Sequence, residues 1–457
     1  MAIPSVPRAQ KPLLFFASYS GEGHTNPVLA IATFMVRRGY EVVYLCSKDF
    51  EEKIKSVGAE FIEIDWAPQL KPREELSRVA EMPPGIERLA LQLVIIFYKA
   101  MSIRARVIAE TLEKLKARDP SRQIIYVEDI LNMGAMPFRY SCSLPAGFDN
   151  PPKTIGISPI PLLIQSRDTA PVPLGLSPDS TDSGRARNQA LWKLAIEGPL
   201  RPLTDAWLQA LKECGCATIP SGNPMNGWYT AHDATVMLCS PSLEYSLSDM
   251  PSTVHFAGCL PRGKVSPSYE YPDWWPEVIA HGRGSQSSKR VIFVCQGTVN
   301  LDWRELVIPT LRAFADRRDI LIVAALGSRG ARLEDDVDIP SNARVIDYLP
   351  YDAVLPLAHI FISNGGYGGL QHAVMNGTAT VFAGETEEKA EVGMRGAWAG
   401  FAVNLKTQTP TTDKLRAAVA EILGNERYLK RASELQAENE ALDCLSRIKE
   451  LIEILTE

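Results

Sequence analysis

The chain has 457 residues, of which 46% are hydrophobic and 22% are charged, as in an ordinary folded globular protein. This length allows two or three domains with substantial cores. The formal net charge of −6 argues against nucleic acid or an anionic membrane surface as the main partner.

The eight cysteines form no CxxC pair, and several lie in apolar runs, as Cys295 does in VIFVC. We interpret them as small buried thiols of a reducing compartment, which predicts a cytoplasmic location. The N-terminal stretch MAIPSVPRAQK has no apolar signal core. The most apolar run, Leu89–Tyr98, is shorter than the roughly 20 residues that cross a bilayer, so no membrane span is predicted.

The first half of the chain alternates apolar runs with helical segments. LLFFAS (13–18) predicts a strand, Pro27–Arg38 a helix that Asn26 caps and Gly39 closes, and EVVYLC a second strand. Residues 66–120 are predicted to be mostly helical, QIIYVED (123–129) to be a buried strand, 141–185 to be loops, and 186–213 to be helical. The βαβ alternation indicates a parallel sheet with helices on both faces.

Residues 263–289 are dense in Pro, Gly and Ser and are predicted to be a linker. Regular alternation then resumes. The second half is predicted to contain six strands with helices between them, in VIFVCQG, DILIVAALG, ARVIDYL, HIFISNGG, TATVFAG and FAVNL. Residues 427–455 form a charged amphipathic helical tail. We therefore expect two doubly wound domains that face each other across a cleft.

The stretch YSGEGHTNP (19–27) places a histidine where a strand ends and a helix begins. Ligands bind at such positions in open α/β sheets. The partial positive charge of a helix N-terminus disfavours imidazolium, so we expect His24 to be neutral and available as a general base. Gly21 and Gly23 leave room for a ligand. The alternative is that His24 only caps its helix or lines a turn.

Glu128 and Asp129 end the QIIYVED strand at the same predicted sheet edge as His24. A carboxylate there can hold the imidazole in one tautomer and stabilise its charged form. The alternative is a helix cap or a surface acid. The presence of both sites on one edge favours a functional pair.

The stretch ISNGGYGGLQHA (362–373) takes a strand into a glycine-rich turn and then a helix. Glycines let backbone N–H groups approach a phosphate, and the helix dipole favours negative charge. No Walker sequence or GxGxxG fingerprint is present, and glycine-rich turns are common without any phosphate. Gln296, Gly297 and Thr298 follow VIFVC and offer a second turn, with a hydroxyl group, on the same edge.

These stretches, in this order, resemble the UDP-glycosyltransferases that attach sugars to small lipophilic acceptors. GEGHTNPVLAIATFMVRRGYEVVY matches the opening segment of that family, and DYLPYDAVLPLAHIFISNGGYGGLQHAVMNGTATVFAGETEEKAE matches its donor-binding signature. The sequences of these segments are most similar to those of fungal or bacterial members. The resemblance covers nearly the whole chain, although it is thin from about residue 66 to 260, where these enzymes vary with the acceptor.

The resemblance implies the GT-B fold, an α/β architecture with two Rossmann-like domains. Residues 1–262 would then bind the acceptor, and residues 290–425 would bind the nucleotide sugar. The tail, residues 426–457, would return to the first domain.

The resemblance also assigns roles to single residues. His24 matches the general base and Asp129 the acid that orients it. Tyr348 falls where the family has a tryptophan that stacks on uracil, and a tyrosine can also stack. The remaining residues that the resemblance places against the donor are Gln296, Gly297, Thr298, Leu349, Tyr351, Asn364, Gly366, Gly368, Gly369, His372, Glu388 and Lys389.

Three further donor positions depart from the family pattern. Asn364 stands where a phosphate-binding histidine is usual, and it brings no charge. His372 replaces the glutamate that binds the ribose and cannot match a bidentate carboxylate. Glu388 keeps the acid of the sugar-reading pair, while Lys389 replaces its neutral amide. The alternative for EEKAE is an acid-rich first helical turn.

The resemblance thus implies an inverting glycosyltransferase that moves a sugar, glucose from UDP-glucose in the first instance, to a hydroxyl of a phenol, polyketide, terpenoid or sterol. The sequence shows no cluster of His, Asp and Glu with metal spacing, so we expect no metal and no cofactor besides the sugar nucleotide. Leu89–Tyr98, Met133–Phe138 and Trp207 supply either acceptor surface or plain core. A nucleotide-sugar epimerase and a non-catalytic nucleotide-sugar-binding subunit remain as alternatives.

Overall fold

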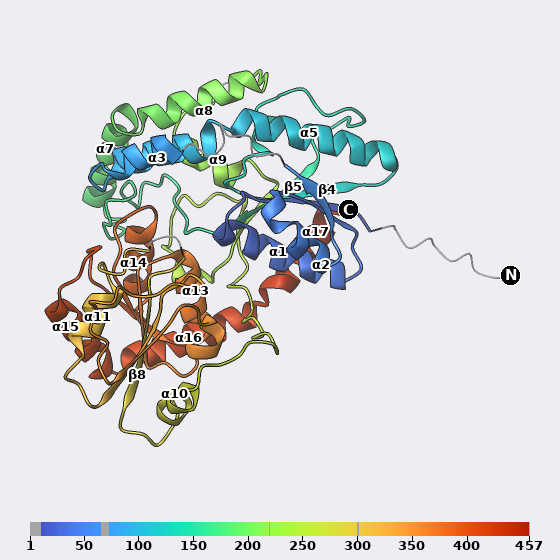
Figure 1. Ribbon diagram of the computed structural model, residues 1–457. Coiled ribbons are helices and arrows are strands. Elements are labelled where there is room, and N and C mark those ends of the chain that lie inside the picture. The colour runs from blue at the N-terminus through green and yellow to red at the C-terminus, as the bar shows by residue number, and fades with distance from the viewer. Residues whose placement is uncertain (1–10, 65–72, 219, 299–300, 457) are drawn as a thin grey trace.

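The computed structural model describes residues 11–64, 73–218, 220–298 and 301–456. Residues 1–10 of the predicted N-terminal segment lie outside the described residues, as do residues 65–72, of which 66–72 belong to the predicted helical region. Two α/β units follow one another along the chain, and each has a parallel sheet (Figure 1).

The first sheet has seven strands in the order β3-β2-β1-β4-β5-β6-β7. Its strands are β1 (Leu13–Ala17), β2 (Val42–Cys46), β3 (Glu60–Glu63), β4 (Ile124–Asp129), β5 (Lys153–Ser158), β6 (Ala234–Met237) and β7 (Val254–Phe256). The helical elements of this half are α1 (Glu22–Arg37), η1 (Lys48–Phe50), α2 (Glu51–Ser56), α3 (Arg73–Ala80), α4 (Ile86–Leu93), η3 (Val94–Tyr98), α5 (Met101–Arg118), α6 (Met136–Arg139), α7 (Asp182–Glu197), α8 (Arg201–Glu213), α9 (Pro224–Thr230) and η4 (Pro241–Leu243).

The second sheet has six strands in the order β10-β9-β8-β11-β12-β13. They are β8 (Arg290–Cys295), β9 (Ile320–Ala325), β10 (Ala343–Ile346), β11 (Ile360–Ser363), β12 (Ala379–Phe382) and β13 (Ala402–Asn404), which confirms the six strands that the sequence predicts. The helices are α10 (Trp275–His281), α11 (Val307–Ala313), α12 (Tyr351–Val354), α13 (Tyr367–Met375), α14 (Lys389–Trp398), α15 (Thr412–Leu423), α16 (Arg427–Leu442) and α17 (Cys444–Thr456).

The central strands are apolar on both sides because helices cover both faces of each sheet. Along β1 the side chains alternate between two cores. Leu14 and Phe16 pack with the inner face of α1, whereas Leu13 and Phe15 pack on the other face with Ile108 of α5. This arrangement holds the carboxyl ends of β1 and β4 in one rigid layer.

The tail returns to the first sheet, as predicted (Figure 1). It consists of α16 and α17, which are separated at Asp443, a residue with a left-handed backbone (φ 47°). Three apolar residues of α17 join the core that also contains residues of β1 and α1, namely Cys444, Ile448 and Ile452. The Gln123 amide donates a hydrogen bond to the Leu455 carbonyl at 2.8 Å.

Two details of the predicted elements are wrong. Helix α1 begins at Glu22 and not at Pro27, so Asn26 is not its cap and instead accepts a hydrogen bond from Lys53. Strand β5 lies in the predicted loop 141–185. The predicted helical stretch 186–213 is confirmed and consists of two helices, which are separated by residues 198–200. Helix α10 lies within residues 263–289, whose role as a linker stays a prediction. The domain boundaries at 262, 289 and 425 stay predictions.

The strand orders fix where a ligand can bind. In each sheet the connections run in opposite directions on either side of one point, between β1 and β4 in the first sheet and between β8 and β11 in the second. Such a switch point leaves a crevice beyond the carboxyl ends of the strands. His24, Asp129 and the two turns with candidate phosphate contacts lie at the ends of these four strands, whereas Tyr348 follows β10 and Glu388 follows β12.

Candidate active site

His24 and Asp129 form a hydrogen-bonded pair at the switch point of the first sheet. His24 lies in the first turn of α1, just after β1, and Asp129 is the last residue of β4. The His24 Nδ1 atom lies 2.8 Å from Asp129 Oδ2. The side chain of His24 is 21% exposed, whereas that of Asp129 is fully buried. The structure thus presents an accessible imidazole that is supported from behind by a carboxylate.

Asp129 is held in place by the backbone around it. Its Oδ1 atom accepts a hydrogen bond from the Leu131 N–H at 3.0 Å, and its Oδ2 atom also lies 3.4 Å from the Tyr19 N–H. An ionised carboxylate can only accept hydrogen bonds, so Nδ1 of His24 donates and Nε2 keeps its lone pair. Nε2 is therefore the atom that can take up a proton.

The expectation that the helix terminus keeps His24 neutral is wrong in direction. Burial lowers the pKa of His24, but the charge and hydrogen bond of Asp129, with a smaller contribution from Glu388, outweigh it and raise the pKa above its ordinary value. A carboxylate in direct contact acts more strongly than the partial charge of a helix end. The pair is therefore built to stabilise imidazolium once a proton has been taken up.

Aromatic rings flank the His24 imidazole. Tyr19 meets it edge-on with ring centroids 5.4 Å apart, and the Phe97 ring lies 6.0 Å away. Phe97 belongs to η3, a π-helical segment, and such segments occur frequently at functional sites. Sequence patterns alone do not place Tyr19 or Phe97 next to His24, and the one sequence signal for Phe97 is its position in the apolar run Leu89–Tyr98.

Glu128, the neighbour of Asp129, has a separate role. Its carboxylate is buried and accepts hydrogen bonds from the backbone N–H groups of Gly134 and Ala135, at 2.7 and 2.8 Å. It also lies 3.0 Å from His232 Nε2. These contacts fix the loop that follows β4, and so they support Asp129 without reaching His24.

The glycine-rich turn and the turn after β8 meet at the switch point of the second sheet. The Asn364 side-chain amide donates to the carbonyl of Gln296, and its Oδ1 atom accepts from the Gly366 N–H at 3.4 Å. The amide of Gln296 donates to the Asp302 carbonyl, so this side chain orders the loop after β8. Asn364 thus joins the two turns, and this role does not require a charged side chain.

Two glycines allow the first turn of α14 to lie against this turn. A Cβ atom on Gly384 would come within 2.0 Å of the Asn364 carbonyl oxygen, and one on Gly365 (φ 84°) would come within 3.2 Å of the Lys389 carbonyl oxygen. Gly366 caps α13, and a Cβ on Gly368 would meet nothing within 4 Å. Gly368 is exposed in the first turn of α13, where the N–H groups of a helix have no partner within the helix and suit an anion.

Tyr348 and Leu349 follow β10. The Arg329 guanidinium lies over one face of the Tyr348 ring, 4.4 Å from its centroid. The Tyr348 carbonyl accepts a hydrogen bond from the Tyr269 hydroxyl at 3.0 Å, and Leu349 is buried. Arg329 could not be predicted from the sequence, because a single arginine in a loop does not indicate which aromatic ring it contacts.

His372 lies on α13 beside Tyr351 and Asp352 of α12. Its Nδ1 atom is 3.0 Å from Asp352 Oδ1, and its ring meets the Tyr351 ring edge-on at 5.2 Å. Burial would raise the pKa of Asp352, but the hydrogen bonds from His372, Asn376 and the Gly263 backbone outweigh it and lower that pKa. A histidine–carboxylate pair, which the sequence pattern does not reveal, therefore stands where the family pattern has one glutamate.

Glu388 caps α14, and Lys389 is the first residue of that helix. The Lys389 ammonium bonds to Glu387 and, at 3.0 Å, to Thr386, so it is occupied within its own turn. Burial raises the pKa of Glu388, with Lys389 opposing, and its charge acts on His24. The charge of Glu388, in the second unit, thus adds to the raised pKa of His24 in the first. Thr298 is exposed at the turn after β8.

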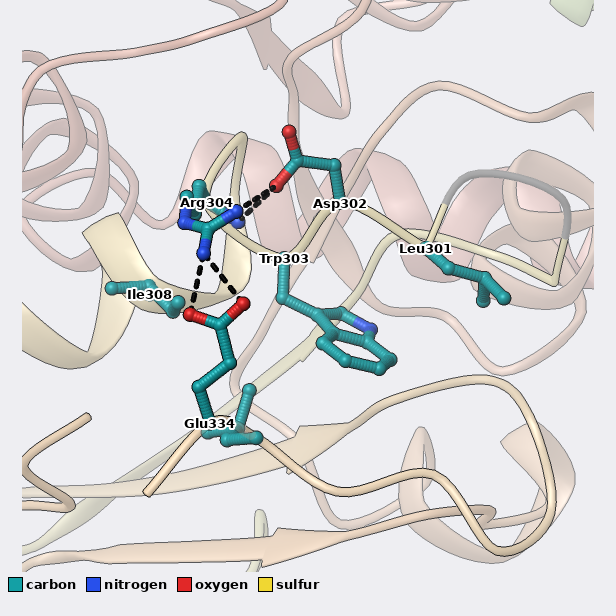
Figure 2. Close-up of a pocket in the computed structure, with 7 residues that line it drawn as sticks. Leu301, Asp302, Trp303, Arg304, Ile308 and Glu334 are labelled. Atoms are coloured by element: carbon teal, nitrogen blue, oxygen red, sulfur yellow. Dashed lines mark hydrogen bonds and ion pairs between the residues drawn. The ribbon is translucent and has the colours of Figure 1, made fainter. Parts of the chain in front are cut away.

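A cavity of about 250 Å³ opens near the end of β8 (Figure 2). Arg304 bonds to Glu334 there and lies 3.9 Å from Asp302, so two acids surround one base. This charge balance does not suit a diphosphate.

Among the described residues, no group of three or more His, Cys, Asp or Glu side chains could hold a metal ion. Within that same part of the chain, no helix combines the length and apolarity needed to cross a membrane.

Comparison with known proteins places this arrangement in a family. Residues 311–455 match the family model described as "Erythromycin biosynthesis protein CIII-like, C-terminal domain". The chain is 36% identical to UDP-glucosyltransferase 1 of Beauveria bassiana, over 94% of this chain and 92% of that protein. It is 34% identical to UDP-glucosyltransferase A1 of Starmerella bombicola, over 98% and 93% of the two chains.

The fold is also that of solved glycosyltransferases. The crystal structure of the glycotransferase of kitacinnamycin superposes with a TM-score of 0.69 at 18% identity, covering 98% of this chain and 100% of that one. At this identity the likeness establishes the two-domain GT-B fold and not the substrate. Together with the relatives that are more than 30% identical over almost their full length, it shows that the chain belongs to the UDP-glycosyltransferase family and is a UDP-glycosyltransferase.

Proposed function

We propose that this enzyme transfers glucose from UDP-glucose to a hydroxyl group of a small lipophilic acceptor, with inversion at the anomeric carbon and without a metal ion. The observation that carries the proposal is the 2.8 Å contact between His24 Nδ1 and Asp129 Oδ2, which leaves Nε2 of a partly exposed imidazole as a base. The relatives named as UDP-glucosyltransferases support the choice of donor.

In the proposed reaction, His24 Nε2 takes the proton of the acceptor hydroxyl. The oxygen forms a bond to the anomeric carbon on the face opposite the diphosphate. The bond from that carbon to the phosphate oxygen breaks, and UDP leaves with the electron pair. Asp129 stabilises the imidazolium that results, as the acid of a triad does.

The second unit supplies the donor site. The N-terminal turn of α13, with Gly366, Gly368 and Gly369, directs backbone N–H groups at the diphosphate and stabilises the charge that develops on it. The uracil stacks on the Tyr348 ring, on the face opposite Arg329. His372, supported by Asp352, hydrogen-bonds the ribose, and Glu388 hydrogen-bonds the sugar between α14 and His24.

The acceptor occupies the side of the first unit, where Tyr19 and Phe97 flank His24. These rings favour an apolar or aromatic molecule with one hydroxyl group, such as a phenol, polyketide, terpenoid or sterol. Trp207 is not part of this wall. It is buried in the core, and its indole N–H points to Met136 Sδ at 3.2 Å.

The test is an assay of the purified enzyme with UDP-glucose, with and without a panel of phenols and sterols, read by mass spectrometry. The proposal predicts a glycoside that appears only when an acceptor is present. An epimerase would change the sugar without an acceptor, and a helper subunit would do neither. Either result would overturn the proposal. The cytoplasmic location stays a prediction, with which the eight free cysteines agree.

A further inference from the structure

A buried charged cluster joins the two units at a place that the proposed reaction does not use. It consists of Arg395 of α14, Glu391 one turn earlier, and Glu244 and Tyr245, which follow η4. We call it the Arg395 cluster. Arg395, Glu244 and Glu391 are 3%, 4% and 5% exposed. Charges are rarely buried this deeply unless every one of them is paired.

The guanidinium of Arg395 reaches across from the second unit to the first. Its Nε atom lies 2.6 Å from Glu244 Oε1, and its Nη2 atom donates to the carbonyl of Leu162 at 2.6 Å. It also lies over the Tyr245 ring, 4.4 Å from the centroid. On its own helix, Glu391 accepts from Nη1 at 2.7 Å and so orients the group. One side chain therefore holds a helix of the donor side against the acceptor side.

Glu244 extends this contact to a loop at the acceptor side. Its Oε2 atom accepts a hydrogen bond from the Leu162 N–H at 3.0 Å, so Arg395 and Glu244 together hold both backbone polar groups of Leu162. This loop, residues 159–165, begins directly after β5, whose residue Ile157 pairs with Asp129 of β4. The next residue is fixed too, since the Leu163 N–H donates to the Tyr229 hydroxyl.

The same helix carries the residue proposed to read the sugar. Glu388 and Lys389 begin α14, and Arg395 follows about 9 Å further along the axis at the rise of about 1.5 Å per residue. Movement of domains relative to each other is the default when no large interface restrains them. A buried ion pair contributes little net stability but has strict geometry, which suits it to fixing a register.

We propose that Arg395 is a positioning residue, which holds the first turn of α14 in register with His24 through Glu244 and the loop 159–165. The proposal rests on the proposed transfer reaction. When the register is lost, the donor still binds to the glycine-rich turn, but the acceptor oxygen no longer reaches the anomeric carbon. Water then attacks that carbon more often, and the enzyme releases free glucose and UDP in place of glycoside.

The test uses Arg395→Lys and Glu244→Gln, with Arg416→Lys as the matched control. Arg416 bonds to the Ala313 carbonyl and the exposed Asp316 within the second unit. A lysine at position 395 keeps the positive charge but cannot make the hydrogen bonds to Glu244 and to Leu162 at the same time. Both variants should raise the ratio of free glucose to glycoside at least tenfold and change the affinity for UDP less than threefold. The control should stay within twofold of the wild type in both measurements.

An unchanged product ratio in both variants would overturn the proposal. If Arg395→Lys fails to fold, as loss of UDP binding would reveal, Glu244→Gln alone decides. If the wild-type enzyme forms no glycoside at all, the proposed function fails, and hydrogen exchange decides on the cluster. The amides of Leu162 and Leu163 should then exchange at least tenfold faster in Glu244→Gln than in the wild type. Equal rates would show that the Arg395 cluster does not hold the loop 159–165.

Discussion

The imidazole of His24 and the carboxylate of Asp129 meet at 2.8 Å although they are 105 positions apart in the chain. Two neighbouring parallel strands bring them together, because β1 pairs with β4 in the register Ala17↔Glu128. Asp129 is buried and His24 is partly exposed. The contact therefore holds a partly exposed base against a buried carboxylate.

Replacement of Asp129 by Asn should move the pH profile of transfer. The Asp129 charge raises the pKa of His24 and burial lowers it, so without the charge that pKa should fall. The wild-type rate should be lost as pH falls through a pKa above the ordinary 6.5, because the base becomes protonated. In Asp129→Asn this acid limb should move to lower pH, and the plateau rate should drop. An acid limb that stays in place would mean that another group titrates.

Replacement of Tyr348 by Ala should weaken UDP binding. Stacking of a base on an aromatic ring contributes about 1–3 kcal/mol, which corresponds to roughly 5- to 150-fold in Kd. Calorimetric titration with UDP measures the effect. Tyr348→Phe is the control and should bind within threefold of the wild type, since its ring is retained. Equal affinity in the Ala variant would place the uracil elsewhere.

Replacement of Glu388 by Gln should raise the KM for UDP-glucose and leave the Kd of UDP unchanged. A hydrogen bond to a charged group contributes about 1.5–3 kcal/mol, so a rise of roughly 10- to 150-fold is expected. UDP itself serves as the internal control, because it lacks the sugar that Glu388 is proposed to bind. A parallel loss of UDP affinity would show that Glu388 only supports the glycine-rich turn.

Treatment with EDTA should leave the transfer rate within twofold of the untreated enzyme. The start of α13 is proposed to stabilise the leaving diphosphate, as a metal ion does in other enzymes. Dialysis against EDTA followed by the transfer assay measures this, with added Mg²⁺ as the control. A loss of more than tenfold that Mg²⁺ restores would contradict the prediction of metal independence.

The sequence predicts best where the residues have strong local signals. The six strands of the second sheet follow from apolar runs, and the helical character of the tail follows from its periodicity, whereas the return of the tail follows from the family resemblance. Short or polar elements were missed. Strand β5 begins with Lys and Thr in a region rich in Pro and Ser, and the start of α1 at Glu22 was hidden by Pro27, which lies inside the helix.

The candidate site was predictable only in part, for a physical reason. A motif indicates which residues follow a strand, so His24 and Asp129 could be expected on one edge. It does not indicate which side chains from distant segments contact them. The pairing of His372 with Asp352, the arginine over Tyr348 and the Arg395 cluster all depend on tertiary contacts. The raised pKa of His24 likewise needs the distance to Asp129, which only the fold fixes.

The turnover of His24→Ala with a transferable acceptor tests the account most directly. The expected loss is about 10²–10⁴-fold in kcat, the usual contribution of a general base, with the Kd of UDP unchanged. His281→Ala serves as the control, since His281 ends α10 and contacts Ser287. Turnover of His24→Ala within threefold of the wild type would contradict the account.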